Sequence, residues 1–108
     1  MSVKILIADD HPLFRAAMCH ALNSIDHISL VETSTFPDTL NCLSSNNDID
    51  ILIISTSHDE YKNSERFIQR LINKESMMIY DTVGIFSENE IKKLSKKHKI
   101  KVLGRGDL

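Results

Sequence analysis

The sequence lacks the features that mark secreted, membrane-spanning and polyanion-binding proteins. Its N-terminus has no basic start followed by an apolar stretch and a small-residue cleavage site, so no signal peptide is predicted. No apolar run approaches the roughly 18 residues of a transmembrane helix. Thirteen Lys and Arg against fifteen Asp and Glu give a formal net charge of -2, which excludes a whole-chain attraction to nucleic acid or an anionic membrane. We therefore expect a cytoplasmic protein without membrane association.

Cysteine is also scarce. Cys19 and Cys42 are the only two, they lie far apart, and neither belongs to a C-x-x-C or zinc-ligand pattern. Both fall in apolar helical patterns, which predicts buried free thiols. The histidines show no ligand spacing, and we expect all five in turns or on the surface: His11, His20, His27, His58 and His98.

The length and composition predict one compact domain spanning residues 1–108. Of the 108 residues, 42% are apolar, which is enough for one modest core but not for two. Short apolar runs bounded by polar residues predict buried strands at 3–8, 28–33, 51–54, 77–80 and 100–103.

Segments with apolar residues at helical spacing separate these strands. Pro12 and Pro37 suit the first turns of helices, and Ser87 with Glu90 three residues on predicts a capping box. A third helix is expected to include Tyr61. Five strands alternating with four helices predict an α/β fold with a doubly wound parallel sheet. Such folds usually add a last covering helix after the fifth strand, and we expect this final helix to be missing or to lie outside this chain.

The opening segment closely resembles bacterial response-regulator receiver domains, in the version carried by regulators with a LuxR-type helix-turn-helix. The residues that carry the resemblance are 4–15, Lys-Ile-Leu-Ile-Ala-Asp-Asp-His-Pro-Leu-Phe-Arg. Weaker agreement in pattern continues through all five strands. The resemblance implies the flavodoxin-like strand order 2-1-3-4-5, with an active pocket at the carboxyl ends of the strands. In the family this pocket holds a nucleophilic Asp, carboxylates for Mg²⁺, and a hydroxyl and a cation for the phosphoryl oxygens.

Matching the family's pocket to this chain leaves its central residue replaced. Asp9 and Asp10 stand where the family keeps its metal-binding acidic pair, but the phosphoacceptor position falls on Ser55. A serine hydroxyl is neutral and a poor nucleophile without an adjacent general base, so no acyl phosphate can form there. An anionic metal ligand is lost with the Asp. We therefore expect no catalysis and no resident cofactor, with Mg²⁺ bound weakly at Asp9 and Asp10 or not at all.

The other switch positions of the family are altered as well. The Ser or Thr at the end of the fourth strand aligns with Thr82 or with Asp81, and the sequence leaves both open. The family's Lys after the fifth strand has Arg105 as its nearest equivalent, one residue late. The aromatic residue of the fifth strand falls on Lys101 or Val102, and neither side chain can act as an aromatic rotamer switch.

The resemblance and the lost Asp together predict a non-catalytic, phosphorylation-independent receiver module of a two-component-type transcriptional regulator. It would act through homodimerisation or through contact with a histidine kinase or another regulator, and it would reach DNA only through an output domain outside this chain. Two alternatives stay open. One is a receiver that still accepts phosphate at another residue, such as Asp59 or Asp81. The other is a stand-alone protein-interaction module.

Overall fold

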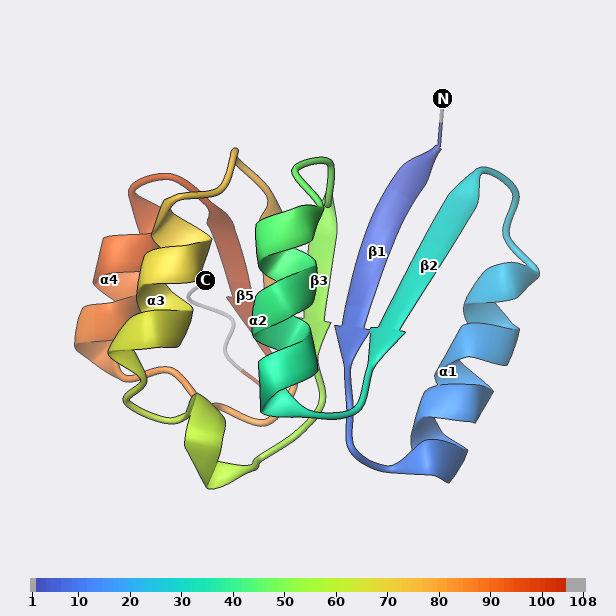
Figure 1. Ribbon diagram of the computed structural model, residues 1–108, viewed down its shortest axis with the longest axis horizontal. Helices are drawn as coiled ribbons and strands as arrows, with labels where there is room; N and C mark the ends of the chain where they lie inside the picture. The colour runs from blue at the N-terminus through green and yellow to red at the C-terminus, as the bar shows by residue number, and fades with distance from the viewer. Residues whose placement is uncertain (1, 105–108) are drawn as a thin grey trace.

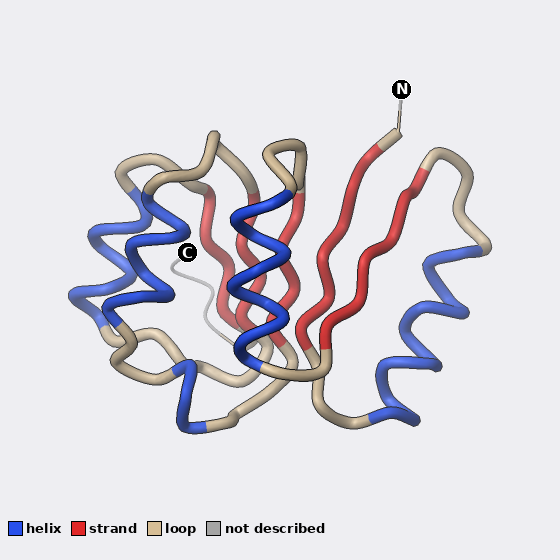
Figure 2. The backbone as a smooth tube through the Cα atoms, in the orientation of Figure 1, coloured by secondary structure: helices blue, strands red, loops and turns tan. Residues whose placement is uncertain are grey.

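The computed structural model describes residues 2–104 and contains one five-stranded parallel sheet (Figure 1, Figure 2). The strand order is β2-β1-β3-β4-β5, and every neighbouring pair runs parallel. This confirms the predicted flavodoxin-like α/β arrangement. The strands are β1 (Val3–Ala8), β2 (Ile28–Thr33), β3 (Ile51–Ile54), β4 (Met78–Asp81) and β5 (Lys99–Val102).

Hydroxyl side chains fix the starts of three of the helices. Thr35, Ser64 and Ser87 each accept a backbone N–H from the first turn that follows them. The predicted capping box is confirmed, because Glu90 Oε1 accepts the Ser87 N–H at 2.8 Å. The helices are α1 (Pro12–Asn23), α2 (Phe36–Ser45), the short 3-10 helix η1 (Asp59–Tyr61), α3 (Glu65–Ile72) and α4 (Glu88–Ser95).

The two faces of the sheet are covered unequally (Figure 1). Helices α2, α3 and α4 pack on one face over a large core that contains the fully buried Phe67, Leu71 and Leu94. Helix α1 packs on the other face over a smaller core, whose strand residues come from β1, β2 and β3. On that second face, alternation along the strands directs Tyr80 and Lys101 outward, and both are half-buried.

The predicted elements differ from the observed ones at three places. Tyr61 lies in η1 and not in α3, because Asn63 has a left-handed φ of 52° and Ser64 starts a new helix. β4 begins one residue later than predicted. The N–H of the apolar Met77 is bound by the His98 ring at 3.1 Å and does not enter the sheet. β5 begins and ends one residue earlier than predicted.

His98 lies in the turn between α4 and β5, as predicted, but it is buried and not on the surface, with 4% of its surface exposed. Its Nδ1 accepts the Met77 N–H, and its Nε2 lies 2.6 Å from the Leu71 carbonyl oxygen, to which it donates. Burial lowers the pKa of His98, which favours the neutral ring that an accepting Nδ1 requires. The imidazole thus ties the end of α3 to the start of β4.

The two cysteines are free, as predicted, with Cys19 buried and Cys42 half-buried. Burial raises the pKa of both thiols, which disfavours the reactive thiolate. None of the helices within residues 2–104 combines the length and the apolar character needed to cross a bilayer.

Candidate functional site

The carboxyl ends of β1, β3, β4 and β5 bring four residues into one row: Asp9, Ser55, Thr82 and Leu103. The sheet pairing continues one residue past the strands, because the last three each donate a backbone N–H to the neighbouring strand at 2.9 or 3.0 Å. Alternation along each strand places these side chains on the side of α1. We call these four residues the carboxyl-edge row.

The Asp9 carboxylate is fully buried and only half satisfied. Its Oδ1 accepts the backbone N–H of His11 at 2.8 Å, whereas its Oδ2 has no hydrogen-bond partner in the described part of the chain. Arg15 does not neutralise it, since the guanidinium binds the Asp9 backbone carbonyl at 2.9 Å and Glu32 at 3.0 Å. A buried carboxylate oxygen left unpaired is unfavourable, so this atom calls for a cation or a hydrogen-bond donor.

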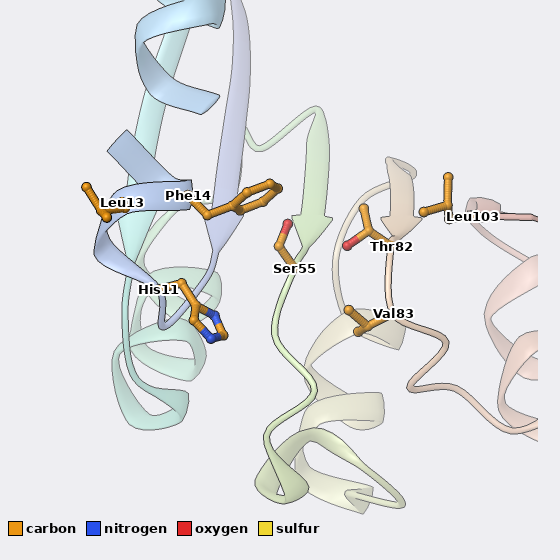
Figure 3. Close-up of a pocket in the computed structure, with 7 residues that line it drawn as sticks. All are labelled: His11, Leu13, Phe14, Ser55, Thr82, Val83 and Leu103. Atoms are coloured by element: carbon orange, nitrogen blue, oxygen red, sulfur yellow. The ribbon is translucent and has the colours of Figure 1, made fainter. Parts of the chain in front are cut away.

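Ser55 Oγ is the other buried side-chain polar atom without a partner among residues 2–104. It stands next to Asp9 in the carboxyl-edge row. His11 lines the same cleft (Figure 3), but its Nδ1 is directed to Asp10 and Asp9 at 3.0 and 3.5 Å. The serine therefore lacks the hydrogen-bonded base that a nucleophilic hydroxyl requires.

The structure places Thr82 in the carboxyl-edge row and Asp81 on the opposite face of the sheet. Thr82 Oγ1 donates to the Ile54 carbonyl oxygen at 2.8 Å and lies beside Ser55 (Figure 3). Asp81 is fully buried, and its two carboxylate oxygens accept four backbone N–H groups from the turn that follows: Val83, Gly84, Ile85 and Phe86. Thr82 is therefore the hydroxyl in the carboxyl-edge row, and Asp81 shapes the loop.

β5 contains no aromatic residue, and Leu103, the residue that follows it, is the apolar end of the carboxyl-edge row. Val102 is buried in the large core, on the face away from the row. Lys101 is half-buried and lies two residues before Leu103, on the same face. The position predicted for the family's cation, Arg105, lies outside the described residues.

An apolar cleft of about 560 Å³ opens over three members of the carboxyl-edge row, Ser55, Thr82 and Leu103 (Figure 3). Leu13 and Phe14 from the start of α1 form one wall, and Val83 and Leu103 form the other. These four side chains are between 42% and 88% exposed, and they make up four of the six large exposed apolar residues in the part of the chain that is described. Sequence reasoning missed this cleft, because an exposed apolar residue at the start of a helix looks like a core residue in the pattern.

Three polar side chains meet at the end of β1. One ligand atom each of Asp9, Asp10 and His11 lies within 4.8 Å of the others. The family resemblance implies Mg²⁺ here, and the unpaired Asp9 oxygen suits a cation. Mg²⁺, however, prefers an octahedron of hard oxygen ligands. Ser55 brings no charge and the third member of the cluster, His11, offers a nitrogen, so these residues fit Mg²⁺ poorly.

Comparisons with protein-family models, with curated proteins and with solved structures gave no significant match to this chain. The fold, the carboxyl-edge row and the cleft are therefore the grounds on which we base its function.

Proposed function

We propose that this chain is a receiver-like signalling module that acts by contact with a partner and without phosphorylation. Its strand order, the acidic pair after β1 and the Thr82 hydroxyl after β4 support a relationship to receivers. The observation that carries the proposal is Ser55. A neutral alcohol with no bound base occupies the position where phosphoryl transfer needs an anionic oxygen.

In this proposal the module belongs to a two-component-type transcriptional regulator in the cytoplasm. A histidine kinase or another regulator contacts it, and DNA is reached only through an output domain outside this chain. The free thiols support this setting because cysteines in an oxidising compartment usually form disulfides. The formal charge of -2 supports it because direct binding of a polyanion favours a basic chain.

A second copy of the chain is the partner that the exposed apolar residues favour. Leu13, Phe14, Val83 and Leu103 surround one cleft, and a stable interface has an apolar centre with a polar rim. Homodimers of this kind are usually symmetric, with the same patch on both copies. The cleft then forms the centre of the dimer interface.

The geometry gives less support to phosphorylation at another carboxylate. The side chain of Asp59 is 96% exposed and pairs with Lys62 at 3.6 Å. Both oxygens of Asp81 are bound to backbone N–H groups in the interior. Phosphoryl transfer requires a carboxylate that has a free oxygen and a neighbouring metal ligand. Among the contacts of residues 2–104, neither Asp59 nor Asp81 meets both conditions.

Phosphorylation is tested with acetyl phosphate and Mg²⁺, followed by intact mass spectrometry. We expect no phosphoryl adduct on the wild-type chain. The Ser55→Asp variant restores a carboxylate beside Asp9 and is the test for a gain of the adduct, while Ser57→Asp, at an exposed position two residues on, is the matched control. An adduct on the wild-type protein would overturn the proposal.

Self-association is tested by sedimentation velocity. We expect a dimer at high concentration, weakened by Phe14→Glu at the cleft. Ile25→Glu is the control, because Ile25 is equally exposed but lies just past the far end of α1. A wild-type chain that stays monomeric at high concentration contradicts dimerisation, and equal effects of the two variants contradict the cleft as its centre.

A further inference from the structure

We propose that Asp9, Asp10 and His11 form a binding site for a borderline transition-metal dication such as Zn²⁺, in preference to Mg²⁺. The position is the one where the family resemblance implies Mg²⁺, but Ser55 supplies no carboxylate there. His11, which belongs to the segment that carries the resemblance, adds an imidazole nitrogen beside the two carboxylates. This inference holds whether or not the chain signals by contact.

Two of the three spacings between the side-chain atoms match a shared ion, and all three atoms lie within 4.8 Å of one another. Donor atoms that each lie about 2.0 to 2.2 Å from one zinc ion are separated from one another by about 3.0 to 3.6 Å. His11 Nδ1 lies 3.0 Å from Asp10 Oδ1 and 3.5 Å from Asp9 Oδ1. The side chains of His11 and Asp10 are 74% and 39% exposed, so both can adjust around an ion held at the buried Asp9.

The unpaired atoms beside the cluster point to the same place. Asp9 has a side chain with no exposed surface and an Oδ2 without a partner, and this oxygen gains its missing interaction from a bound cation. Ser55 Oγ, also buried and unpaired, is adjacent in the carboxyl-edge row and can accept a hydrogen bond from a metal-bound water. Two separate polar atoms are thus satisfied by one ion with its water.

Charge and ligand type decide which ion is preferred. Asp9 and Asp10 supply two negative charges, which a dication cancels when His11 binds as neutral imidazole. Imidazole suits Zn²⁺, Co²⁺ and Ni²⁺, whereas Mg²⁺ favours carboxylate, carbonyl and water oxygens. A carboxylate at position 55 would add a third hard anionic ligand and shift the preference back toward Mg²⁺.

The test is isothermal titration of the whole chain with Zn²⁺, and separately with Mg²⁺. We expect one Zn²⁺ per chain, bound more tightly than Mg²⁺. His11→Ala should weaken Zn²⁺ binding by more than about tenfold, since even outer-shell changes reach that size, and should leave Mg²⁺ binding unchanged. His20→Ala, an exposed histidine on α1, is the matched control and should change neither. Because His11 is exposed, its loss should leave the circular dichroism spectrum unchanged.

Two further measurements distinguish this site from metal binding elsewhere on the chain. Co²⁺ bound at the proposed site gives visible d–d bands without a thiolate charge-transfer band, and such a band would place the ion at a cysteine and overturn the proposal. Ser55→Asp should raise Mg²⁺ affinity, and Ser57→Asp should not. No Zn²⁺ binding, or equal binding by wild type and His11→Ala, would overturn the proposal and reduce the cluster to a close polar contact between His11 and Asp10. Those outcomes leave the contact function standing, since mass spectrometry and sedimentation test it separately.

Discussion

Replacing Asp81 by Asn tests how the loop after β4 is held. Oδ1 of Asp81 accepts the N–H of Val83 at 3.1 Å and of Gly84 at 2.7 Å, and Oδ2 accepts the N–H of Ile85 at 2.7 Å and of Phe86 at 3.3 Å. Asparagine has nearly the same shape, but one of its two terminal atoms is an amide nitrogen that donates and cannot accept. Whichever way the amide turns, one of the two short bonds is replaced by two donors facing each other.

The size of the effect follows from these four bonds. A hydrogen bond to a charged group contributes about 1.5 to 3 kcal/mol, and a buried N–H left without an acceptor costs about 1 to 3 kcal/mol. The two bonds on the atom that becomes the amide nitrogen, one short and one longer, are lost outright, and the two bonds on the remaining oxygen weaken because their acceptor becomes neutral. We therefore expect Asp81→Asn to lower the free energy of unfolding by about 3 to 5 kcal/mol, a large share of the total stability of a small domain.

Urea denaturation followed by circular dichroism measures this change. The variant should show a lower midpoint with an unchanged m-value, because the surface exposed on unfolding stays the same. Asp59→Asn is the matched control. Its carboxylate is 96% exposed, and we expect no change in stability. A loss of less than about 1 kcal/mol for Asp81→Asn would refute the view that this carboxylate holds the loop.

Three other predictions concern stability. Acidification should destabilise the wild type more than His98→Gln in urea titrations, because burial lowers the pKa of His98 in the folded state. The stabilising contribution of the neutral His98 ring is complete above a pH of about 6.5, and it declines as the pH falls toward the lower pKa of the folded state. If the free energy of unfolding fell equally with pH in the wild type and in His98→Gln, this prediction would be contradicted. Tyr61→Phe should lower stability by about 1 kcal/mol, since the phenol oxygen lies 2.8 Å from Thr39 Oγ1 while the ring keeps its aromatic contacts. An unchanged Tm would show that this bond contributes nothing. Ser87→Ala should lower the Tm through the loss of the capping box, by about 1 kcal/mol, and Ser57→Ala should not.

The strands of this sheet can be predicted from sequence because burial on both faces demands continuous apolar runs. Three predicted strands, 3–8, 28–33 and 51–54, coincide with β1, β2 and β3. The last two strands shift by one residue because hydrogen bonding and not hydropathy defines where a strand starts. Met77 is apolar and buried, yet its N–H is bound by a histidine ring.

The candidate site is less predictable because it depends on which face of the sheet each residue occupies. A shift of one residue in register moves a side chain to the other face, which is why sequence alone left Thr82 and Asp81 open. An Asp followed by Thr-Val-Gly carries a signal for a side chain that caps its own turn, and that signal favours Thr82 as the site residue. The short distances from the His11 ring to both carboxylates depend on side-chain rotamers, which the order of residues in the sequence does not determine.

Helix α1 buries a smaller share of its residues than α2 and α3. Only Cys19 among its twelve residues is buried, whereas α2 buries four of ten and α3 three of eight. Segments with little buried apolar surface open first in the native state, so backbone amides of α1 should exchange with solvent before those of α2 and α3. Since Leu13 and Phe14 form one wall of the cleft, detachment of this one helix dismantles the wall while the large core stays folded. A ligand or a second copy that binds in the cleft therefore also holds α1 against the sheet.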